Sequence, residues 1–390
     1  QIIKDAAESL MATQLPNGYI GNYAPEYQLQ QWDVWGRKYT SLGLIAWYDL
    51  SGDKKALEAA CRVVDHLMTQ VGPGKVDIVS TGNYIGMPSS SVLEPVMYLY
   101  NRTKEKRYLD FAKYIVGQWE TPGGPQLISK AIADVPVANR FPHPKTWFSR
   151  ENGQKAYEMM SCFEGLLEYA LTVGSEKWKT AAIRFAYRMM ETDITLLGSA
   201  GTTHEFLDHA VVHQVENIEG GVGQETCVSV TWMKLCARML LVTGDPLFGD
   251  CFEQTLYNAY LGTLNYEHIR NPEKIQGGFR LPDVEVAASF LPFDSYTPLL
   301  GGTRGQGIGG SLMFADGTYY GCCACIASVG IGIAPHLAVL RADNGFSVQL
   351  YEKGVYQTQT ASGNGVTFLI ETDYPVDDAI HIRVEPQEAE

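Results

Sequence analysis

Two short segments, far apart in the chain, carry residue types that bind borderline-soft metal ions. Cys322, Cys323 and Cys325 stand almost side by side, and Glu225 and Cys227 lie far upstream. Thiolate sulfur and carboxylate oxygen are ligands of zinc, and four such ligands complete a tetrahedral shell. One Glu and a trio of Cys would be enough, so the sequence predicts a zinc site assembled by folding.

Three chemistries are open to such a site. A closed zinc site with four protein ligands usually only holds loops together. A redox dithiol is less consistent, because adjacent cysteines form a strained disulfide. The third possibility makes one thiolate a nucleophile.

Attack on a sugar would also need a general acid near the leaving oxygen. Glu205 is a candidate, because Phe206 and Leu207 beside it could desolvate its carboxyl group and raise its pKa. The alternative for Glu205 is an ordinary solvated carboxylate.

Both thiol segments are expected on irregular backbone just before a helix. Residues two apart on a helix diverge by roughly 200°, whereas in an extended segment they point the same way. We therefore expect the helices to begin near Ser229 and near Ala327, after the metal-binding residues. Helix N-termini stabilise anions, and thiolate is an anion.

Four segments share one layout, in which an apolar helix is followed by a short polar turn and a second helix. Gly suits the left-handed position that ends a helix, and Asp or Ser suits the N-cap of the next. Each copy predicts an αα-hairpin, and such hairpins must stack to bury their faces. The turns lie at 51–53, 103–105, 173–175 and 243–245. We expect a mainly α chain with a closed α/α barrel over residues 1–343, the catalytic domain.

The pattern changes in residues 344–390. Alternating or β-branched apolar residues at 346–351, 366–370 and 380–384 are typical of strands. We expect the beginning of a C-terminal β-sandwich domain that is cut short at Glu390.

Composition excludes some partners and leaves others open. The 390 residues include 30 Lys and Arg against 44 Asp and Glu, a net charge of −14, which argues against nucleic acid and anionic membranes. No apolar run in the sequence reaches the length of a membrane span. The acidic net charge is compatible with a neutral substrate. A homodimer is left open.

The cellular location is also left open. The chain starts at Gln1 without Met or a signal segment, so we expect a processed or truncated piece. Free thiols suit the cytoplasm, whereas zinc protects thiols and export would explain the missing Met. Periplasmic, secreted and cytoplasmic locations therefore all stay open.

Together these residues resemble glycoside hydrolase family 127, the β-L-arabinofuranosidase-like enzymes. The resemblance rests on Glu205, Glu225-Thr226-Cys227 and Cys322-Cys323 in this order. It extends through 232–235, 243–245 and 256–259 and covers nearly the whole chain.

The resemblance implies a retaining glycosidase on an (α/α)6 barrel followed by β-sandwich domains, and it leaves open whether the first barrel helix is missing from this chain. It implies Zn²⁺ bound by Glu225, Cys227, Cys322 and Cys323. It makes Cys322 the nucleophile and Glu205 the general acid/base. The implied substrate is an oligosaccharide or glycan side chain that carries β-L-arabinofuranose or a related sugar, in plant-type glycans.

The chain departs from the family pattern at several positions. His204 precedes the acid/base, Cys325 adds a thiol after the pair, and Lys155 stands where the family has a sugar-contacting His. These departures indicate a divergent branch. The candidate substrate-binding residues are Asp33, Lys38, Lys155, Glu158 and Tyr320.

Two other functions compete with hydrolysis. A carbohydrate-binding α/α-barrel protein without catalysis would carry the same zinc only as a structural ion. An epimerase or lyase usually relies on His or Tyr bases, and the eight His residues form no obvious pair.

Overall fold

The computed structural model describes residues 1–142, 151–201, 203–215, 223–264, 296–298, 312–313, 319–320 and 322–387. The chain divides into two compact units. The first is Gln1–Ile194 with Gly201–Glu216, and the second is Thr195–Ala200 with Asn217–Glu390. The division into domains at residue 343 stays a prediction.

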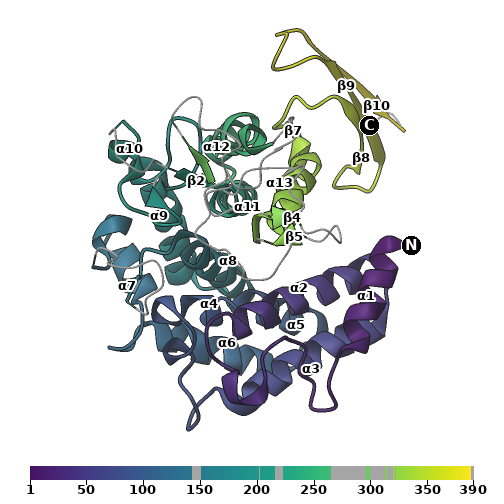
Figure 1. The fold of residues 1–390 in the computed structure, drawn as a ribbon. Helices are drawn as coiled ribbons and strands as arrows, with labels where there is room; N and C mark the ends of the chain where they lie inside the picture. The colour runs from purple at the N-terminus through teal and green to yellow at the C-terminus, as the bar shows by residue number, and fades with distance from the viewer. Residues whose placement is uncertain are drawn as a thin grey trace. The chain divides into compact units, whose positions relative to one another are not determined.

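The first unit is built from helices that pair along the chain (Figure 1). Within it α2 packs on α3, α5 on α6 and on α8, and α8 on α9. Its α-helices are α1 (Ile2–Ala12), α2 (Asp33–Ser51), α3 (Lys54–Gln70), α4 (Met87–Ser90), α5 (Leu93–Thr103), α6 (Lys106–Trp119), α7 (Leu127–Ile132), α8 (Ala156–Val173), α9 (Glu176–Thr192) and α10 (Ala210–His213). Its short pieces are η1 (Pro25–Tyr27), η2 (Ile78–Ser80), η3 (Tyr84–Gly86), η4 (Val137–Asn139) and β1 (Thr203–His204).

The predicted hairpin turns are confirmed, and their backbone explains the residues found there. Gly52 and Gly174 end α2 and α8 in the left-handed region, at φ +74° and +69°. Asp53 and Ser175 follow them as N-caps whose side chains accept hydrogen bonds from the next helix. In the second hairpin Lys104 takes the left-handed position, at φ +57°. The turn geometry therefore repeats even where glycine does not.

Helix α8 is buried on nearly every side, which makes it the central helix of the first unit. It contacts α4, α5 and α9, and Phe163 on α8 stacks on Phe185 of α9 with ring centroids 3.9 Å apart. Full burial of one such ring contributes about 2–3 kcal/mol to folding. The start of α8 is consequently held inside the unit. It carries two predicted site residues, Lys155 at the N-cap and Glu158 in the first turn.

Two glycine substitutions in this unit should change stability in opposite directions. Gly174 has open space around it but a positive φ, so Gly174→Ala should lower the free energy of unfolding by about 1 kcal/mol. Gly43 lies mid-helix in α2, also in open space, so Gly43→Ala should raise it by about 0.5–1 kcal/mol. Guanidinium unfolding followed by circular dichroism measures both. Equal shifts of the same sign would contradict this reading of the turn.

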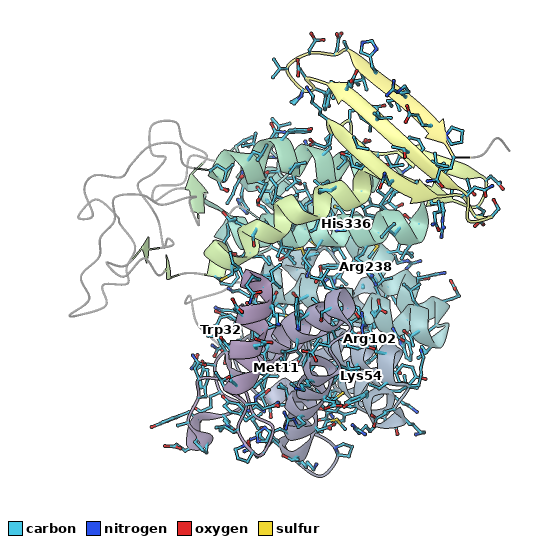
Figure 2. All side chains as sticks on the ribbon, turned by 90° about the vertical axis from the view of Figure 1, so that its right-hand side faces the viewer. Met11, Trp32, Lys54, Arg102, Arg238 and His336 are labelled. Carbon is cyan, nitrogen blue, oxygen red and sulfur yellow. The ribbon has the colours of Figure 1, made fainter. Side chains whose placement is uncertain are left out.

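The second unit is centred on α11 (Thr226–Thr243), which contacts α12 (Leu247–Gln254), the π-helical η5 (Thr255–Tyr260) and α13 (Cys322–Ala338). Arg238 on α11 and His336 on α13 are marked in Figure 2. Contrary to the expectation from sequence, α11 is long and apolar enough to cross a membrane by length and composition. In the structure 67% of it is buried, as in the core helix of a folded unit.

Short strands complete the second unit. β2 (Gly223–Glu225) pairs with β3 (Tyr296–Pro298), β4 (Leu312–Met313) with β5 (Tyr319–Tyr320), and β6 (Val339–Ala342) with β7 (Gly345–Val348), all antiparallel. The last sheet has the order β10-β9-β8, formed by β8 (Gly354–Gln359), β9 (Gly365–Thr372) and β10 (Ile380–Pro386). Figure 2 shows side chains on both faces of this sheet. The predicted change to strands near the end of the chain is confirmed, while the β-sandwich itself stays a prediction.

Candidate metal centre and acid site

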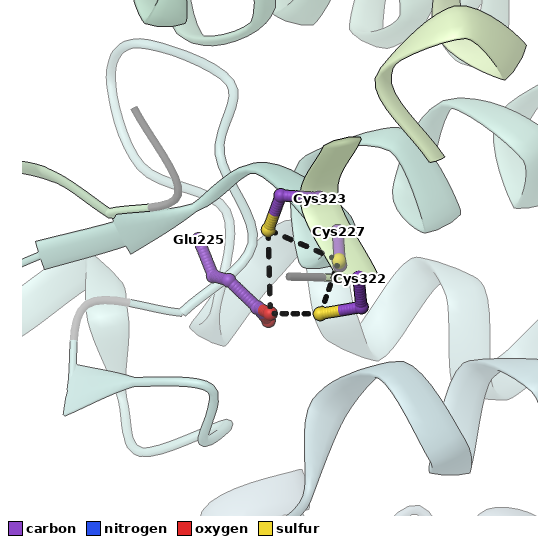
Figure 3. A group of neighbouring side chains, drawn as sticks. All are labelled: Glu225, Cys227, Cys322 and Cys323. Carbon is purple, nitrogen blue, oxygen red and sulfur yellow. Dashed lines mark hydrogen bonds between the residues drawn. The ribbon is translucent and has the colours of Figure 1, made fainter. Parts of the chain in front are cut away.

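Four side chains of the second unit bring their ligand atoms together, as Figure 3 shows. One atom each from Glu225, Cys227, Cys322 and Cys323 lies within 4.8 Å of the others. The Cys227 Sγ is 3.1 Å from that of Cys322 and 3.2 Å from that of Cys323, and Glu225 Oε1 is 3.8 Å from the Sγ atoms of Cys322 and Cys323. Zinc–sulfur bonds of about 2.3 Å in a tetrahedron would place sulfurs about 3.8 Å apart. The four residues, called here the thiol–carboxylate cluster, need only a small expansion to surround an ion.

The backbone around the thiol–carboxylate cluster differs from the prediction. The helices begin at Thr226 and Cys322, not near Ser229 and Ala327, so the thiols lie in the first turns and only Glu225 precedes its helix, as its N-cap residue. Neighbouring helix positions diverge by about 100°. The Sγ atoms of Cys322 and Cys323 nevertheless both lie close to that of Cys227, at 3.1 and 3.2 Å, so two adjacent cysteines can bind one ion. First-turn N–H groups have no partner within their helix and favour anions such as thiolate.

A close contact fixes α13, which carries two of the thiols. The ring of Tyr260 on η5 packs against Gly330, where a Cβ atom would lie only 2.6 Å from the ring. The Tyr260 hydroxyl donates a hydrogen bond to the carbonyl oxygen of Ala327 on the same helix. Glycine is therefore required at residue 330 for η5 and α13 to approach this closely.

The three thiols of the cluster differ in their exposure to solvent. Cys227 and Cys323 are 0% and 1% exposed, whereas Cys322 is exposed. Burial, and then hydrogen bonds with the other two thiols, raise the pKa of Cys227 well above that of a free thiol. A divalent cation would reverse this shift, because it stabilises thiolate.

The donor set decides which ions fit. Three sulfurs and one carboxylate oxygen suit a borderline-soft ion such as zinc far better than Mg²⁺ or Ca²⁺, which prefer oxygen. Cys325 is also exposed, but its thiol does not belong to the cluster. The thiol–carboxylate cluster can therefore hold a metal ion.

Glu205 belongs to the first unit, where backbone pairing places it at the start of α8. The amide of Ala156 donates to the carbonyl oxygen of Glu205 at 2.8 Å, and the amide of Leu207 donates to that of Gln154 at 2.9 Å. The first of these bonds satisfies a first-turn N–H of α8 that has no partner within the helix. The pairing also brings the Glu205 carboxylate against the Lys155 ammonium as an ion pair.

Lys155 and Glu158 are thus close to Glu205, as substrate-site candidates should be. Both side chains are buried, at 3% and 2% exposure, and Lys155 Nζ is 3.7 Å from Glu158 Oε1. Burial raises the pKa of Glu158, while Lys155 and then Lys38 act in the opposite direction. Their predicted contact with substrate stays a prediction.

The contacts of Asp33 favour a structural role. Its carboxylate accepts hydrogen bonds from the Tyr19 hydroxyl, the Leu29 amide and the Arg37 guanidinium, at 2.8, 2.8 and 2.5 Å. These donors use both oxygens, so they tie the loop before α2 to that helix. The predicted binding of a sugar hydroxyl by Asp33 stays a prediction.

Lys38 is fully buried, and its Nζ lies 3.3 Å from Oε2 of Glu94 and 5.0 Å from the centre of the Trp35 ring. Glu94 is absent from the sequence-based candidates. A single acidic residue inside the apolar segment 92–97 is the signal that could have pointed to it. Tyr320 lies in β5, and its side chain is outside the described part of the structure.

Comparisons with known proteins agree with the resemblance found in the sequence. Residues 1–270 match the family described as beta-L-arabinofuranosidase, GH127 catalytic domain. The non-reducing end beta-L-arabinofuranosidase of Bifidobacterium longum subsp. longum is 22% identical, over 61% of this chain and 38% of that protein.

Solved structures show the same fold. A GH127 beta-L-arabinofuranosidase from Geobacillus stearothermophilus T6 has a TM-score of 0.66 at 19% identity, covering 98% of this chain and 59% of that one. A structure described as a glycoside hydrolase has a TM-score of 0.68 at 15% identity, covering 100% and 60%. The predicted fold class, mainly α and of the (α/α)6-barrel type, is confirmed.

The chain spans less than two thirds of the length of each of these relatives. The family match nevertheless covers well over half of the chain and both segments that supply Glu205, Glu225 and Cys227. The chain therefore belongs to the family described as beta-L-arabinofuranosidase, GH127 catalytic domain.

Proposed function

We propose that this chain is the catalytic part of a zinc-dependent retaining glycoside hydrolase, which releases β-L-arabinofuranose or a related sugar from plant-type glycans. One observation carries the proposal. The thiol–carboxylate cluster contains one exposed sulfur, that of Cys322, beside two buried ones, those of Cys227 and Cys323. A metal site that only holds loops together does not require a sulfur that a substrate can reach, whereas a nucleophile must be accessible. The family membership and the substrates in the names of the relatives support the choice of sugar.

The proposed reaction has two displacements at the anomeric carbon. In the first, the Cys322 thiolate attacks this carbon and the bond to the leaving oxygen breaks, while Glu205 gives its proton to that oxygen. In the second, the Glu205 carboxylate takes a proton from water, the water oxygen attacks the same carbon, and the thiolate leaves. Two inversions at one carbon retain its configuration.

The proposed metal ion is Zn²⁺, held by Glu225, Cys227, Cys322 and Cys323. Bound there, it would supply ionised thiols near neutral pH. The chain itself contributes two first-turn segments that favour anions and a packed α13 that fixes the direction of Cys322. The carbohydrate is proposed to bind beside Glu205, where Lys155 and Glu158 lie.

Hydrolysis of an aryl β-L-arabinofuranoside, measured with and without a chelator, tests the proposal. We expect release of the aryl group, loss of release after chelation and recovery with added Zn²⁺, since removing the ion returns the thiols to their neutral form. The aryl α-L-arabinofuranoside is the matched control and should not be cleaved. Proton NMR of the first product should show the β-anomer. Turnover that survives complete removal of the metal would contradict the proposal.

A further inference from the structure

One buried ammonium group, that of Lys155, lies between two carboxylates of the first unit. It forms an ion pair with Glu205, and its Nζ is 3.7 Å from Oε1 of Glu158. A charge removed from water is stable only when it is paired. The single ammonium group of Lys155 is therefore shared by the carboxylates of Glu205 and Glu158.

The surrounding structure leaves this ammonium little freedom. Lys155 is the N-cap residue of α8, and Glu158 follows three residues later in its first turn. The backbone bridge between Lys155 and Phe206 fixes the chain beside Glu205. The rings of Tyr84 and Trp32 cover it, with centres 4.9 and 5.7 Å from Nζ. Lys155 is therefore held, buried, against its two carboxylates.

The two carboxylates differ in their surroundings. Glu158 is completely buried, and its Oε2 accepts no hydrogen bond from the described residues. Burial raises the pKa of Glu158. The Glu205 side chain is 13% exposed and in direct contact with the ammonium. Glu158 is thus the more deeply buried of the two carboxylates that share the Lys155 ammonium.

Neighbouring groups from the other elements leave this arrangement in place. On α2, Lys38 acts on Glu158 but is itself paired with Glu94 of α5 at 3.3 Å. On α8, the Cys162 thiol is neutral, because burial raises its pKa to about 12. Lys155 thus contacts both carboxylates.

We propose that Lys155 is a positioning residue for the reaction: shared between Glu205 and Glu158, it sets the pH range over which Glu205 holds the proton that it must deliver. The inference rests on the proposed function, in which Glu205 is the general acid/base. When Lys155 moves toward an ionised Glu158, Glu205 keeps a proton for the leaving oxygen. When Lys155 is held by Glu205, that carboxylate is ionised and ready to accept a proton from water. The two carboxylates share one ammonium, so protonation of one affects protonation of the other.

Two variants should move the pH dependence in opposite directions. The basic limb of kcat/KM reports loss of the proton on Glu205, which the first displacement needs. Lys155→Met removes the positive charge, so the limb should move up by about 1–3 pH units. Glu158→Gln removes the competing negative charge, so Lys155 acts on Glu205 alone and the limb should move down. The measurement uses an alkyl β-L-arabinofuranoside, whose leaving oxygen needs protonation.

The controls separate this role from a purely structural one. Lys155→Arg keeps the positive charge, so the basic limb of kcat/KM should stay near that of the wild type. If Lys155→Met does not fold, Lys155→Arg and Glu158→Gln together test whether the charge of Lys155 sets the position of this limb. Carbon-13 NMR of protein labelled in its glutamate carboxyl groups, assigned with Glu205→Gln, follows Glu205 without substrate. The midpoint of the Glu205 titration should move up in Lys155→Met and down in Glu158→Gln, as the basic limb does.

Limbs and midpoints that stay at their wild-type positions, or that move the same way in both variants, would overturn the inference. Absence of hydrolysis by the wild type would instead count against the proposed function, and the NMR titration would still decide the coupling of Lys155 to Glu205.

Discussion

Cys322→Ser is expected to lower kcat by about 10⁴-fold or more, with the fold retained. A serine hydroxyl is far less acidic than a thiol, so the variant has no comparable anion to attack the anomeric carbon. Glu225, Cys227 and Cys323 remain to hold the metal ion, which should stay bound at reduced affinity. Steady-state kinetics with an aryl β-L-arabinofuranoside, together with metal analysis of the purified variant, measures both effects.

The matched control for this substitution is Cys325→Ser. Cys325 is an exposed thiol on the same helix, one turn further along, and it lies outside the thiol–carboxylate cluster. Its loss should leave kcat and metal content unchanged. Cys322→Ser with kcat within tenfold of the wild type would exclude Cys322 as the nucleophile.

Glu205→Gln is expected to lower kcat/KM for an alkyl glycoside by about 10²–10⁴-fold, because the leaving oxygen then departs without a proton. A substrate with an acidic aryl alcohol needs no such help, so its first displacement should stay fast. Water still requires a base in the second displacement, and the covalent intermediate should accumulate. A burst of released aryl alcohol followed by slow turnover measures this directly.

Azide provides the control for Glu205, because it attacks carbon without giving up a proton. Added azide should restore turnover of the aryl substrate by Glu205→Gln and yield a glycosyl azide. Equal losses for alkyl and aryl substrates, with no burst and no effect of azide, would contradict the role of Glu205 as acid/base.

The sequence predicted the parts of this protein that depend on local chemistry. The hairpin turns follow from residues such as Gly52, Gly174 and their N-caps, whose preferences are set within a few positions. The convergence of Glu225 with the paired cysteines followed from ligand chemistry, since few other arrangements explain these residue types. Lys104 shows the limit of this approach, because the turn forms there without the residue that favours it.

Contacts between distant residues could not be predicted in the same way. Nothing near Asp33 in the sequence shows that its carboxylate accepts a hydrogen bond from the hydroxyl of Tyr19, 14 residues earlier in the chain. The pairing of Lys155 with Glu205 depends on a backbone bridge between segments about fifty residues apart. The predicted helix starts, near Ser229 and Ala327, lie later than the observed ones at Thr226 and Cys322, because the prediction assumes that a helix cannot direct adjacent side chains at one ion.

The central claim is that the Cys322 sulfur bonds to the sugar during turnover. Mass spectrometry of Glu205→Gln, mixed with an activated aryl β-L-arabinofuranoside and then digested, tests it most directly. We predict one pentosyl group per chain, on the peptide that contains Cys322 and Cys323, and no such group when Cys322→Ser is added to the variant. A sugar attached to a carboxylate, or an adduct that persists in the double variant, would contradict the claim.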